Sequence, residues 1–381
     1  MIVETFAFRQ DSGWSTSTIP SSLDSTSTLV VVFGAPERAG WEAAFGELVT
    51  AFPRAAIVGC STAGEIFGTS ILDGSMSIGV CKFEKTELRT AIAEVADAGA
   101  SRAAGQQIAS SLAAPDLRGV LVFSDGIAVN GSELVRGLND VLPPEVVVTG
   151  GLAGDGADFK RTWVIAERSV HSNRVTAVGF YGDHVVVGHG SQGGWDIFGI
   201  ERLVTRSAGN VLYELDGKPA LKLYKEYLGE RAAGLPATAL LFPLALRNAS
   251  EPEKTVVRTI LAVDEAAQSL TFAGDIPQGG RVQLMRANFE RLIDGASEAG
   301  QRAAASPALH GGSSLRVAVS CVGRRLVLGE RAEEEIEAVS STMPAGGHMV
   351  GFYSYGEVSP HATGRCDLHN QTMTVTDLSE T

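Results

Sequence analysis

The stretch SSTMPAGGHMVGFYSYGEVSPHATGRCDLHNQTMTVTD, residues 340–377, combines strand patterns with three histidines, two tyrosines, a glutamate and a cysteine. In HMVGFYSYGE (348–357), alternation places Tyr353 and Tyr355 on the same face of a strand. A second alternating segment follows at LHNQTMTV (368–375). The stretch therefore predicts two strands whose polar and aromatic side chains are placed to line a small pocket.

The order of strand and helix signals around this stretch occurs a second time in the chain. Residues 75–167 give a hairpin, a helix, a strand, a helix and two strands, and residues 254–377 give the same succession. Glycine-bearing strand ends fall at corresponding places in both. We expect an α+β (mixed α/β) protein of two related halves, built on largely antiparallel or mixed sheets with flanking helices. A chance recurrence of this order is the alternative.

The boundary between the halves is expected in LGERAAGLPATA (228–239), where glycine, proline and alanine interrupt the pattern. The two expected domains are therefore residues 1–229 and residues 230–381. Superposition of the halves tests this division.

Composition limits the class of protein and its partners. The 381 residues include 44% hydrophobic and 20% charged residues, which is enough to bury a sizeable core. No apolar run is long enough to span a membrane, and the N-terminus lacks the pattern of a secretory signal, so we expect a cytoplasmic protein. The net charge of −13 argues against nucleic acid and anionic lipid as partners.

Familiar catalytic and metal-binding motifs are absent from the sequence. The four cysteines form no CxxC pair, and no GxxxxGK[ST], HExxH or GxSxG motif occurs. GGLAGDG (150–156) resembles a dinucleotide loop, but it precedes a strand and not the helix that would receive a pyrophosphate. A turn between strands is the simpler interpretation.

Two glycine-punctuated strand ends are the candidate ligand-binding regions. Cys60 ends the predicted strand AAIVGC (55–60), and Ser61 and Glu65 follow it; we expect all three to share a pocket rim with YSYGE (353–357). Cys60 is either a nucleophile, for which no partner histidine is evident, or a small buried residue.

In the terminal region, the tyrosines, His369, Asn370 and Glu357 are placed to bind a ligand by hydrogen bonds or to supply an imidazole nitrogen to iron. A polar core held by hydrogen bonds is the alternative. His189, directly after a strand, is a further candidate to face a cleft.

The chain resembles FIST proteins, with an N-terminal and a C-terminal FIST module in order. The segments that carry the resemblance are spread over most of the chain: IVGCSTAGEI (57–66), GGLAGDGADF (150–159), GNVLYELDGKPALKLYKEYLG (209–229), SCVGR (320–324), GFYSYGEVSP (351–360) and LHNQTMT (368–374). The resemblance implies an intracellular bacterial sensory module that binds a small ligand and is not itself an enzyme. Because no output segment is recognisable, it implies a separate partner, such as a histidine kinase or a cyclic-di-GMP enzyme.

The resemblance extends to stand-alone members that sense nitric oxide through b-type haem held by histidine. It implies His369 as the first candidate iron ligand, then His348 and His189, with Tyr353 and Tyr355 enclosing the haem.

Other functions are also compatible with the sequence. A sensor of amino acids or similar metabolites would use polar contacts from Asp155, Arg324, Tyr355 and Glu357. A hydrolase acting on a small metabolite would need a base that the sequence does not reveal, and a protein-interaction scaffold is the third possibility.

Overall fold

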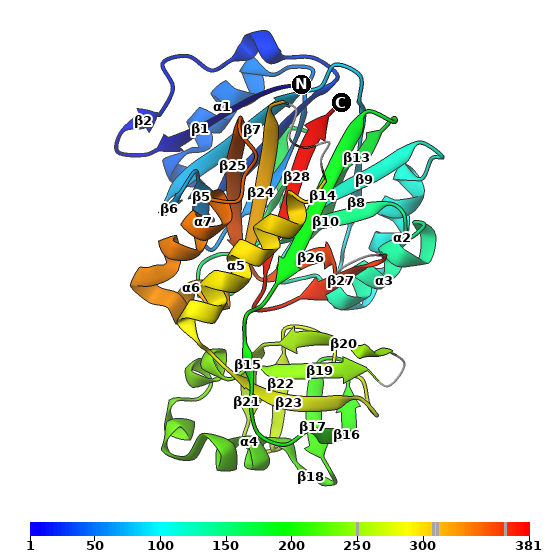
Figure 1. Ribbon diagram of the computed structural model, residues 1–381, viewed down its shortest axis with the longest axis vertical. Helices are drawn as coiled ribbons and strands as arrows, with labels where there is room; N and C mark the ends of the chain where they lie inside the picture. Colours follow the sequence, from blue (N-terminus) through cyan, green and yellow to red (C-terminus); the bar gives the residue numbers. More distant parts are fainter. Residues whose placement is uncertain (249–250, 307–308, 310–311, 362–363) are drawn as a thin grey trace.

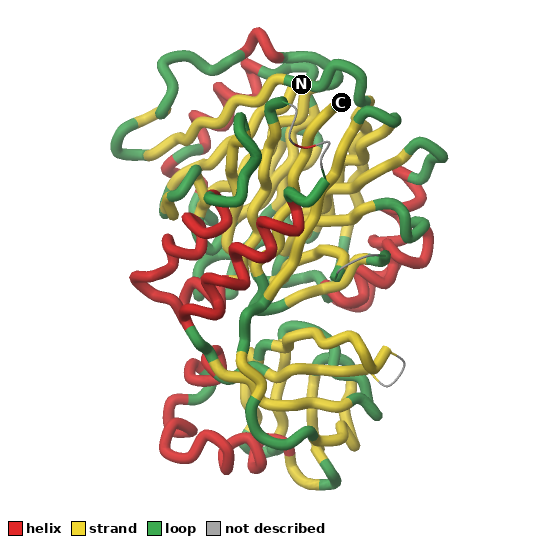
Figure 2. Tube along the Cα trace, in the orientation of Figure 1, coloured by secondary structure: helices red, strands yellow, loops and turns green. Residues whose placement is uncertain are grey.

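The chain folds into two bodies, described by a computed structural model for residues 1–248, 251–306, 309, 312–361 and 364–381. Figure 1 and Figure 2 show a large body of β-sheets with helices on its outside, and a smaller β domain beneath it. The small domain is inserted between β14 (Val185–Gln192) and α5 (Phe289–Ala303). Both termini lie at the end of the large body that is farther from the small domain.

The large body consists of three units that share one order of elements: an edge strand, a strand, a helical connection, a parallel strand, a short hairpin and a returning strand. The first unit contains β1 (Ile2–Arg9), β3 (Thr28–Gly34), α1 (Glu42–Ala51), β4 (Ala56–Ser61), β5 (Glu65–Phe67), β6 (Ser70–Leu72) and β7 (Ser75–Lys82). The second contains β8 (Glu87–Glu94), α2 (Ser101–Leu112), β9 (Leu117–Ser124), α3 (Gly131–Val141), β10 (Val147–Leu152), β11 (Val164–Ala166), β12 (Ser169–His171) and β13 (Arg174–Tyr181).

The third unit closes the chain and encloses the inserted domain. It contains β14, α5, β24 (Ser314–Cys321), α6 (Val322–Leu328), α7 (Ala332–Ser340), β25 (Gly347–Ser354), β26 (Gly356–Pro360), β27 (Cys366–His369) and β28 (Met373–Glu380). Its helices α5 and α7 pack against each other on the outer face of its sheet (Figure 1).

Each unit gives its short hairpin to the sheet of another unit. The three sheets have the orders β12-β11-β4-β3-β7-β1-β2, β27-β26-β10-β9-β13-β8 and β14-β28-β24-β25-β5-β6, where β2 is Gly13–Trp14. The first unit thus completes the sheet of the third, the third completes that of the second, and the second completes that of the first. This cyclic exchange makes the three units interdependent.

The centre of the large body is held by contacts among all three units. Three backbone N–H groups at the strand ends donate to carbonyl groups of another unit: Ala63 to Tyr353 (2.8 Å), Gly154 to Ser61 (2.9 Å) and Tyr355 to Leu152 (3.2 Å). Beside this ring, one phenylalanine from each sheet meets in the core: Phe33 lies 4.7 Å from Phe352 and 5.5 Å from Phe123 between ring centroids. Polar backbone groups and aromatic packing therefore both join the units.

One glycine in each unit allows its parallel strands to approach closely. A Cβ atom on Gly59, Gly150 or Gly351 would lie 1.8, 1.8 or 1.9 Å from the carbonyl oxygen of the neighbouring strand. Such a contact is impossible without moving the backbone, so only glycine fits at these positions. The shared requirement is a residue-level sign of the threefold repeat.

The small domain is an antiparallel β structure against which the helix α4 (Ala220–Leu228) packs. Its strands are β15 (Asp196–Ile197), β16 (Arg202–Ala208), β17 (Val211–Leu215), β18 (Lys218–Pro219), β19 (Leu244–Asn248), β20 (Glu251–Arg258), β21 (Ile260–Asp264), β22 (Ser269–Phe272) and β23 (Arg281–Arg286). The helix α4 buries Leu221 and Tyr224 in a separate hydrophobic cluster with these strands.

The structure confirms the mixed α+β class and changes the expected repeat. The common order occurs in three units and not in two halves. The expected hairpin at residues 75–94 does not form, because β7 pairs with β1 and β3 whereas β8 pairs with β13 in another sheet. Phe83, buried in the core between these strands, lies where the chain passes from one sheet to the next.

The segments from residue 254 onward also differ from their expected place. Residues 255–264 and 269–272 are strands of the small domain and not part of the repeated unit. The position between residues 229 and 230, where we expected a boundary, follows the end of α4 and lies inside that domain.

Candidate functional site

A cavity of about 390 Å³ lies where the strand ends of the large body face the small domain. Most of the groups that line it are apolar. It is lined by Ala157, Phe159, Gly234, Leu235, Pro236, Ala237, Leu240, Thr259, Ile260, Leu261, Ala273, Cys321, Val322, Gly323, Leu326 and Tyr355. A concave, largely apolar space of this size, with a few polar groups, is typical of small-molecule sites.

One wall of the cavity is an aromatic pair from two units. Phe159 stacks on Tyr355 with the ring centroids 4.3 Å apart and the planes 15° from parallel. The Tyr355 hydroxyl donates to Asp155, whose carboxylate also accepts the backbone N–H groups of residues 159, 160 and 161 at 2.7–2.8 Å. Asp155 thus holds in place both the loop that carries Phe159 and the phenol of Tyr355, on which the Phe159 ring stacks.

Polar groups on the cavity wall are few and uncharged. The buried hydroxyl of Thr259 has no hydrogen-bond partner within the described residues. An unpaired buried hydroxyl costs free energy, so it is a natural contact for a polar atom of a ligand. Burial raises the pKa of Cys321 and the pKa of Tyr355, which keeps both groups protonated at neutral pH.

The rim of the cavity exposes large apolar side chains. Phe159, Leu261 and Leu326 expose 46%, 39% and 50% of their surface. Single exposed apolar residues are common, but a group of them around one cavity indicates a binding surface.

Among the residues singled out from the sequence, Tyr355 lines this cavity. Cys60, Ser61 and Glu65 are fully or almost fully buried at the centre of the large body. Glu65 accepts hydrogen bonds from Ser75 (2.7 Å) and from Thr62, and burial raises its pKa to about 7. The strand ends around Cys60 and YSYGE do meet, but the side chains of Cys60, Ser61 and Glu65 pack into the interior and line neither this cavity nor the polar one between α3 and β27.

Glu357 occupies the equivalent position in the third unit. Its carboxylate accepts from the Ser354 hydroxyl (2.6 Å) and from the Thr372 N–H (3.2 Å), and burial raises its pKa to about 8. The neighbouring Asn370 is fully buried, and its Oδ1 lacks a partner within the described residues. Glu65 and Glu357 therefore each accept hydrogen bonds within a buried polar network beside a glycine-bearing strand end.

Arg324 and Tyr353 belong to a third buried network. Arg324 forms an ion pair with Glu335 at 2.8 Å, with both side chains inaccessible to solvent. The Tyr353 hydroxyl donates to the same carboxylate at 2.8 Å. Arg324 also donates to the carbonyl groups of Gly193 and Leu292, so it joins α6 to β14 and α5. These contacts hold the third unit together.

The three candidate haem ligands lie on three different strands, β27, β25 and β14, and none of them lines the apolar cavity. His369 is buried, its Nε2 lies 2.9 Å from the Ser359 carbonyl, and burial lowers its pKa to about 4. His348 Nδ1 lies 3.4 Å from the Thr5 hydroxyl. His189 has a lowered pKa because of burial, and its Nδ1 has no partner in the described part of the chain. The residues that line the cavity therefore do not fit a haem held by these histidines.

The described residues form neither a metal-binding cluster nor a membrane-spanning helix. Within the described ranges, no three histidine, cysteine or acidic side chains are grouped to hold a metal ion. No helix among these residues has the length and hydrophobicity needed to cross a bilayer.

Sequence reasoning missed most of the cavity. Its residues come from six separated parts of the chain, at 157–159, 234–240, 259–261, 273, 321–326 and 355, and no periodicity connects them. The one feature of the sequence that pointed to the cavity is the pair of glycine-bearing strand ends. These predicted Tyr355 as a ligand-binding residue but not its stacking partner Phe159.

An α+β protein with an apolar cavity between two bodies has the features of a small-molecule-binding protein. The FIST N domain is found at residues 28–218 and the FIST C domain at residues 220–360, so the chain belongs to the FIST family. FIST domains are in general sensory domains of signal transduction that bind small ligands. The two family regions meet inside the small β domain, at the start of α4.

No curated protein matches this sequence. Among solved structures, the chain is similar to the crystal structure of cyanuric acid hydrolase from A. caulinodans, at 12% identity and a TM-score of 0.29. The match covers 76% of this chain and 99% of the hydrolase. A likeness at this level supports no conclusion about fold or activity.

Proposed function

We propose that this FIST protein is a sensory protein that binds a small, mostly apolar ligand in the cavity beside Tyr355 and regulates a separate signalling enzyme. The observation that supports this proposal most directly is the apolar rim formed by Phe159, Leu261 and Leu326 around a cavity that contains the unpaired hydroxyl of Thr259. The ligand then has an apolar body and one polar atom that bonds to this hydroxyl.

Binding without catalysis is the proposed mode of action. Of the described residues that line the cavity, none is a histidine or a carboxylate, so no general base faces the ligand. The thiol of Cys321 and the phenol of Tyr355 stay protonated because burial raises both pKa values. The cavity thus favours retention of the ligand over its chemical conversion.

The position of the cavity gives the ligand a route to regulation. The ligand would touch Tyr355 and Leu326 of the large body and Thr259 and Leu261 of the small domain. A ligand that contacts two bodies favours the arrangement in which both contacts are made. The signalling enzyme would then bind one arrangement better than the other, and a coupling free energy of about 1–3 kcal/mol would change its affinity roughly 5- to 150-fold.

A cavity-filling variant tests the binding site. Leu326→Trp places a larger ring at the rim, and we expect it to lower the affinity for a fluorescent apolar probe about tenfold or more. Leu203→Trp is the matched control, because Leu203 is an exposed leucine of the small domain outside the cavity. Equal probe affinity in both variants would refute the site.

The regulatory part needs a separate experiment. The rate of a candidate histidine kinase or cyclic-di-GMP enzyme from the same organism is measured with wild type and with Leu326→Trp, in the presence and absence of a small molecule that co-purifies with the wild type. We expect the rate to depend on that molecule with the wild type alone. A rate that is insensitive to it would contradict regulation and leave the binding site standing.

Haem-based nitric oxide sensing is the more specific proposal, derived from the family resemblance. His189 favours it in one respect, since its buried Nδ1 is unpaired within the described residues and its lowered pKa keeps the imidazole neutral, as iron requires. Absorption spectra after haem reconstitution, for wild type and for His369→Ala, His348→Ala and His189→Ala, test it. Retention of stoichiometric haem and its loss in one variant would establish the ligand, and failure of the wild type to retain haem would end this proposal.

A polar metabolite such as an amino acid is the remaining candidate ligand. Arg324, Asp155 and Glu357, which we expected to hold it, already bond to protein groups. Competition between such metabolites and the apolar probe would favour this alternative.

A further inference from the structure

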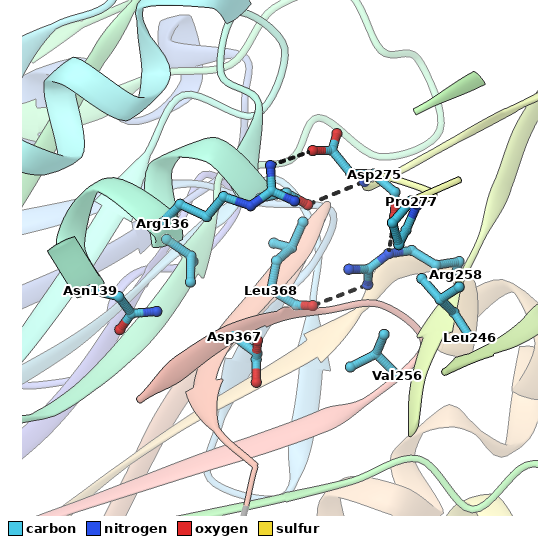
Figure 3. A pocket seen from close by; sticks show the side chains of 11 residues that line it. Arg136, Asn139, Leu246, Val256, Arg258, Asp275, Pro277, Asp367 and Leu368 are labelled. Atoms are coloured by element: carbon cyan, nitrogen blue, oxygen red, sulfur yellow. Dashed lines mark hydrogen bonds and ion pairs between the residues drawn. The ribbon is translucent and has the colours of Figure 1, made fainter. Parts of the chain in front are cut away.

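A second cavity, of about 190 Å³, lies between α3, β27 and the small domain (Figure 3). In contrast to the first, it is lined mainly by polar groups. Its polar lining consists of Ser132, Arg136 and Asn139 of α3, Arg258 and Asp275 of the small domain, and Asp367 of β27. The two cavities share no lining residue, although Arg258 and Thr259 are neighbours in the chain.

Arg258 is the unusual group in this cavity. It exposes 7% of its surface, and no carboxylate in the described part of the chain forms an ion pair with it. Its Nε donates to the Asp275 carbonyl and its Nη1 to the carbonyl groups of Val257 and Leu368, each at 3.1 Å. Within the described residues Nη2 has no acceptor, so a buried cation retains a free donor.

The second arginine of the cavity does not share this property. Arg136 donates to Asp275 at 2.9 Å and also pairs with Glu133. Asp275 in turn accepts from Asn130 at 3.2 Å. The charges of Arg136 and Asp275 therefore compensate each other. Among the described residues, Asp367 and Asp275 attract Arg258 without forming an ion pair with it, and burial outweighs this attraction and lowers the pKa of Arg258 to about 10.

A hydroxyl group supplies a second donor to the same space. Ser132, which exposes 7% of its surface, accepts the backbone N–H of Asp275 at 3.2 Å. Its own proton is donated to no acceptor among the described residues. Arg258 and Ser132 thus offer donors from the two bodies to one small polar cavity.

From this arrangement we infer that the cavity binds a small monocarboxylate, whose oxygen atoms accept from Nη2 of Arg258 and from the hydroxyl of Ser132. A bound carboxylate supplies the direct ion pair that, within the described residues, neither Asp367 nor Asp275 makes with the buried guanidinium. A dianion such as hydrogen phosphate fits less well, because Asp275 and Asp367 also line the cavity and repel a second negative charge. This site is independent of the apolar ligand proposed above.

Calorimetric titration with the sodium salts of acetate, lactate and pyruvate, at constant ionic strength, tests the inference. We expect saturable binding of at least one of them to wild type. The affinity should fall at least fivefold in Ser132→Ala and in Arg258→Lys, which keeps the charge but loses Nη2. Arg206→Gln, a change to an exposed arginine of the small domain, is the control and should bind as wild type does.

Other outcomes decide against the inference. No saturable binding of any monocarboxylate, unchanged affinity in Ser132→Ala, or stronger binding of inorganic phosphate would each overturn it. Arg258 also donates hydrogen bonds to three backbone carbonyl groups, so Arg258→Lys could prevent folding. In that case the affinity of Ser132→Ala for the carboxylate decides whether the inference holds. Leu326→Trp should retain carboxylate binding, which separates this result from failure of the apolar site.

Discussion

Phe159 stacks on Tyr355 at 4.3 Å, although 196 residues separate them in the chain. The pair joins the second unit to the third at the mouth of the apolar cavity. Asp155 supports both rings by accepting the Tyr355 hydroxyl and the N–H of Phe159. A loop of one unit thereby becomes part of a wall that also contains residues of the small domain.

Removal of the Phe159 ring should lower the affinity for the ligand more than it lowers the stability of the fold. Phe159→Ala loses one aromatic stack and a half-exposed side chain, so we expect the free energy of unfolding to fall by about 1 kcal/mol. The affinity for an apolar probe should fall severalfold. Ile200→Ala, at an exposed isoleucine outside the cavity, is the control in fluorescence titration and urea unfolding. An unchanged probe affinity would remove Phe159 from the site.

The close approach of strands at Gly351 predicts a large loss of stability on substitution. Gly351→Ala places a Cβ atom 1.9 Å from the Ala318 carbonyl oxygen, and backbone movement between β24 and β25 is needed to relieve the contact. We expect the free energy of unfolding to fall by at least about 3 kcal/mol in urea denaturation. Gly46→Ala, in α1 with no atom near its Cβ position, should raise it by roughly 0.5–1 kcal/mol. Equal changes in unfolding free energy for the two variants would mean that β24 and β25 move apart at little cost.

The buried ion pair of Arg324 and Glu335 predicts a strong dependence on both partners. Arg324→Met leaves a buried carboxylate without its counterion, and we expect a loss of about 3–5 kcal/mol in the free energy of unfolding. The double variant Arg324→Met/Glu335→Leu should recover part of that loss. Arg206→Met breaks a more exposed pair with Glu214 and should cost less than about 1 kcal/mol. A double variant no better than Arg324→Met would show that the arginine acts through its backbone contacts.

The raised pKa of Glu357 predicts a stability that falls as pH rises. Burial raises this pKa to about 8 in the folded protein. In the unfolded chain the glutamate has its ordinary pKa of about 4.3. Between these values the folded state holds a proton that the unfolded state releases, so the contribution of Glu357 is present at low pH and is lost as pH rises to about 8.

Glu357→Gln should remove this dependence. We expect the difference in unfolding free energy between wild type and Glu357→Gln to change by on the order of 4 kcal/mol from about pH 5 to about pH 8. Glu337→Gln, at an exposed glutamate of α7, is the control. Parallel curves for wild type and Glu357→Gln would show that Glu357 is ionised throughout.

The sequence by itself determined the class of elements and several of their boundaries. Alternation predicted two strands, at residues 348–357 and 368–375, and extended strands do occupy most of both segments. The structure divides each of them, because the chain passes from β25 to β26 and from β27 to β28 between two different sheets. The glycines were informative because their positions are fixed by local geometry: a Cβ at Gly150 would lie 1.8 Å from a neighbouring carbonyl oxygen. The segments quoted for the family resemblance likewise led to the FIST family.

Only the tertiary structure decided how these elements are combined. The pairing of β5 with β25 joins Glu65 to Phe352, and nothing in either strand specifies that partner, since alternation records which face is buried and not which strand lies beside it. For the same reason, the alternation of residues did not predict the exchange of hairpins among the three units or the insertion of a domain before α5. The cavity lies beyond sequence patterns for the same reason: Phe159, Thr259, Leu326 and Tyr355 are brought together by long-range packing, and local propensity does not encode it.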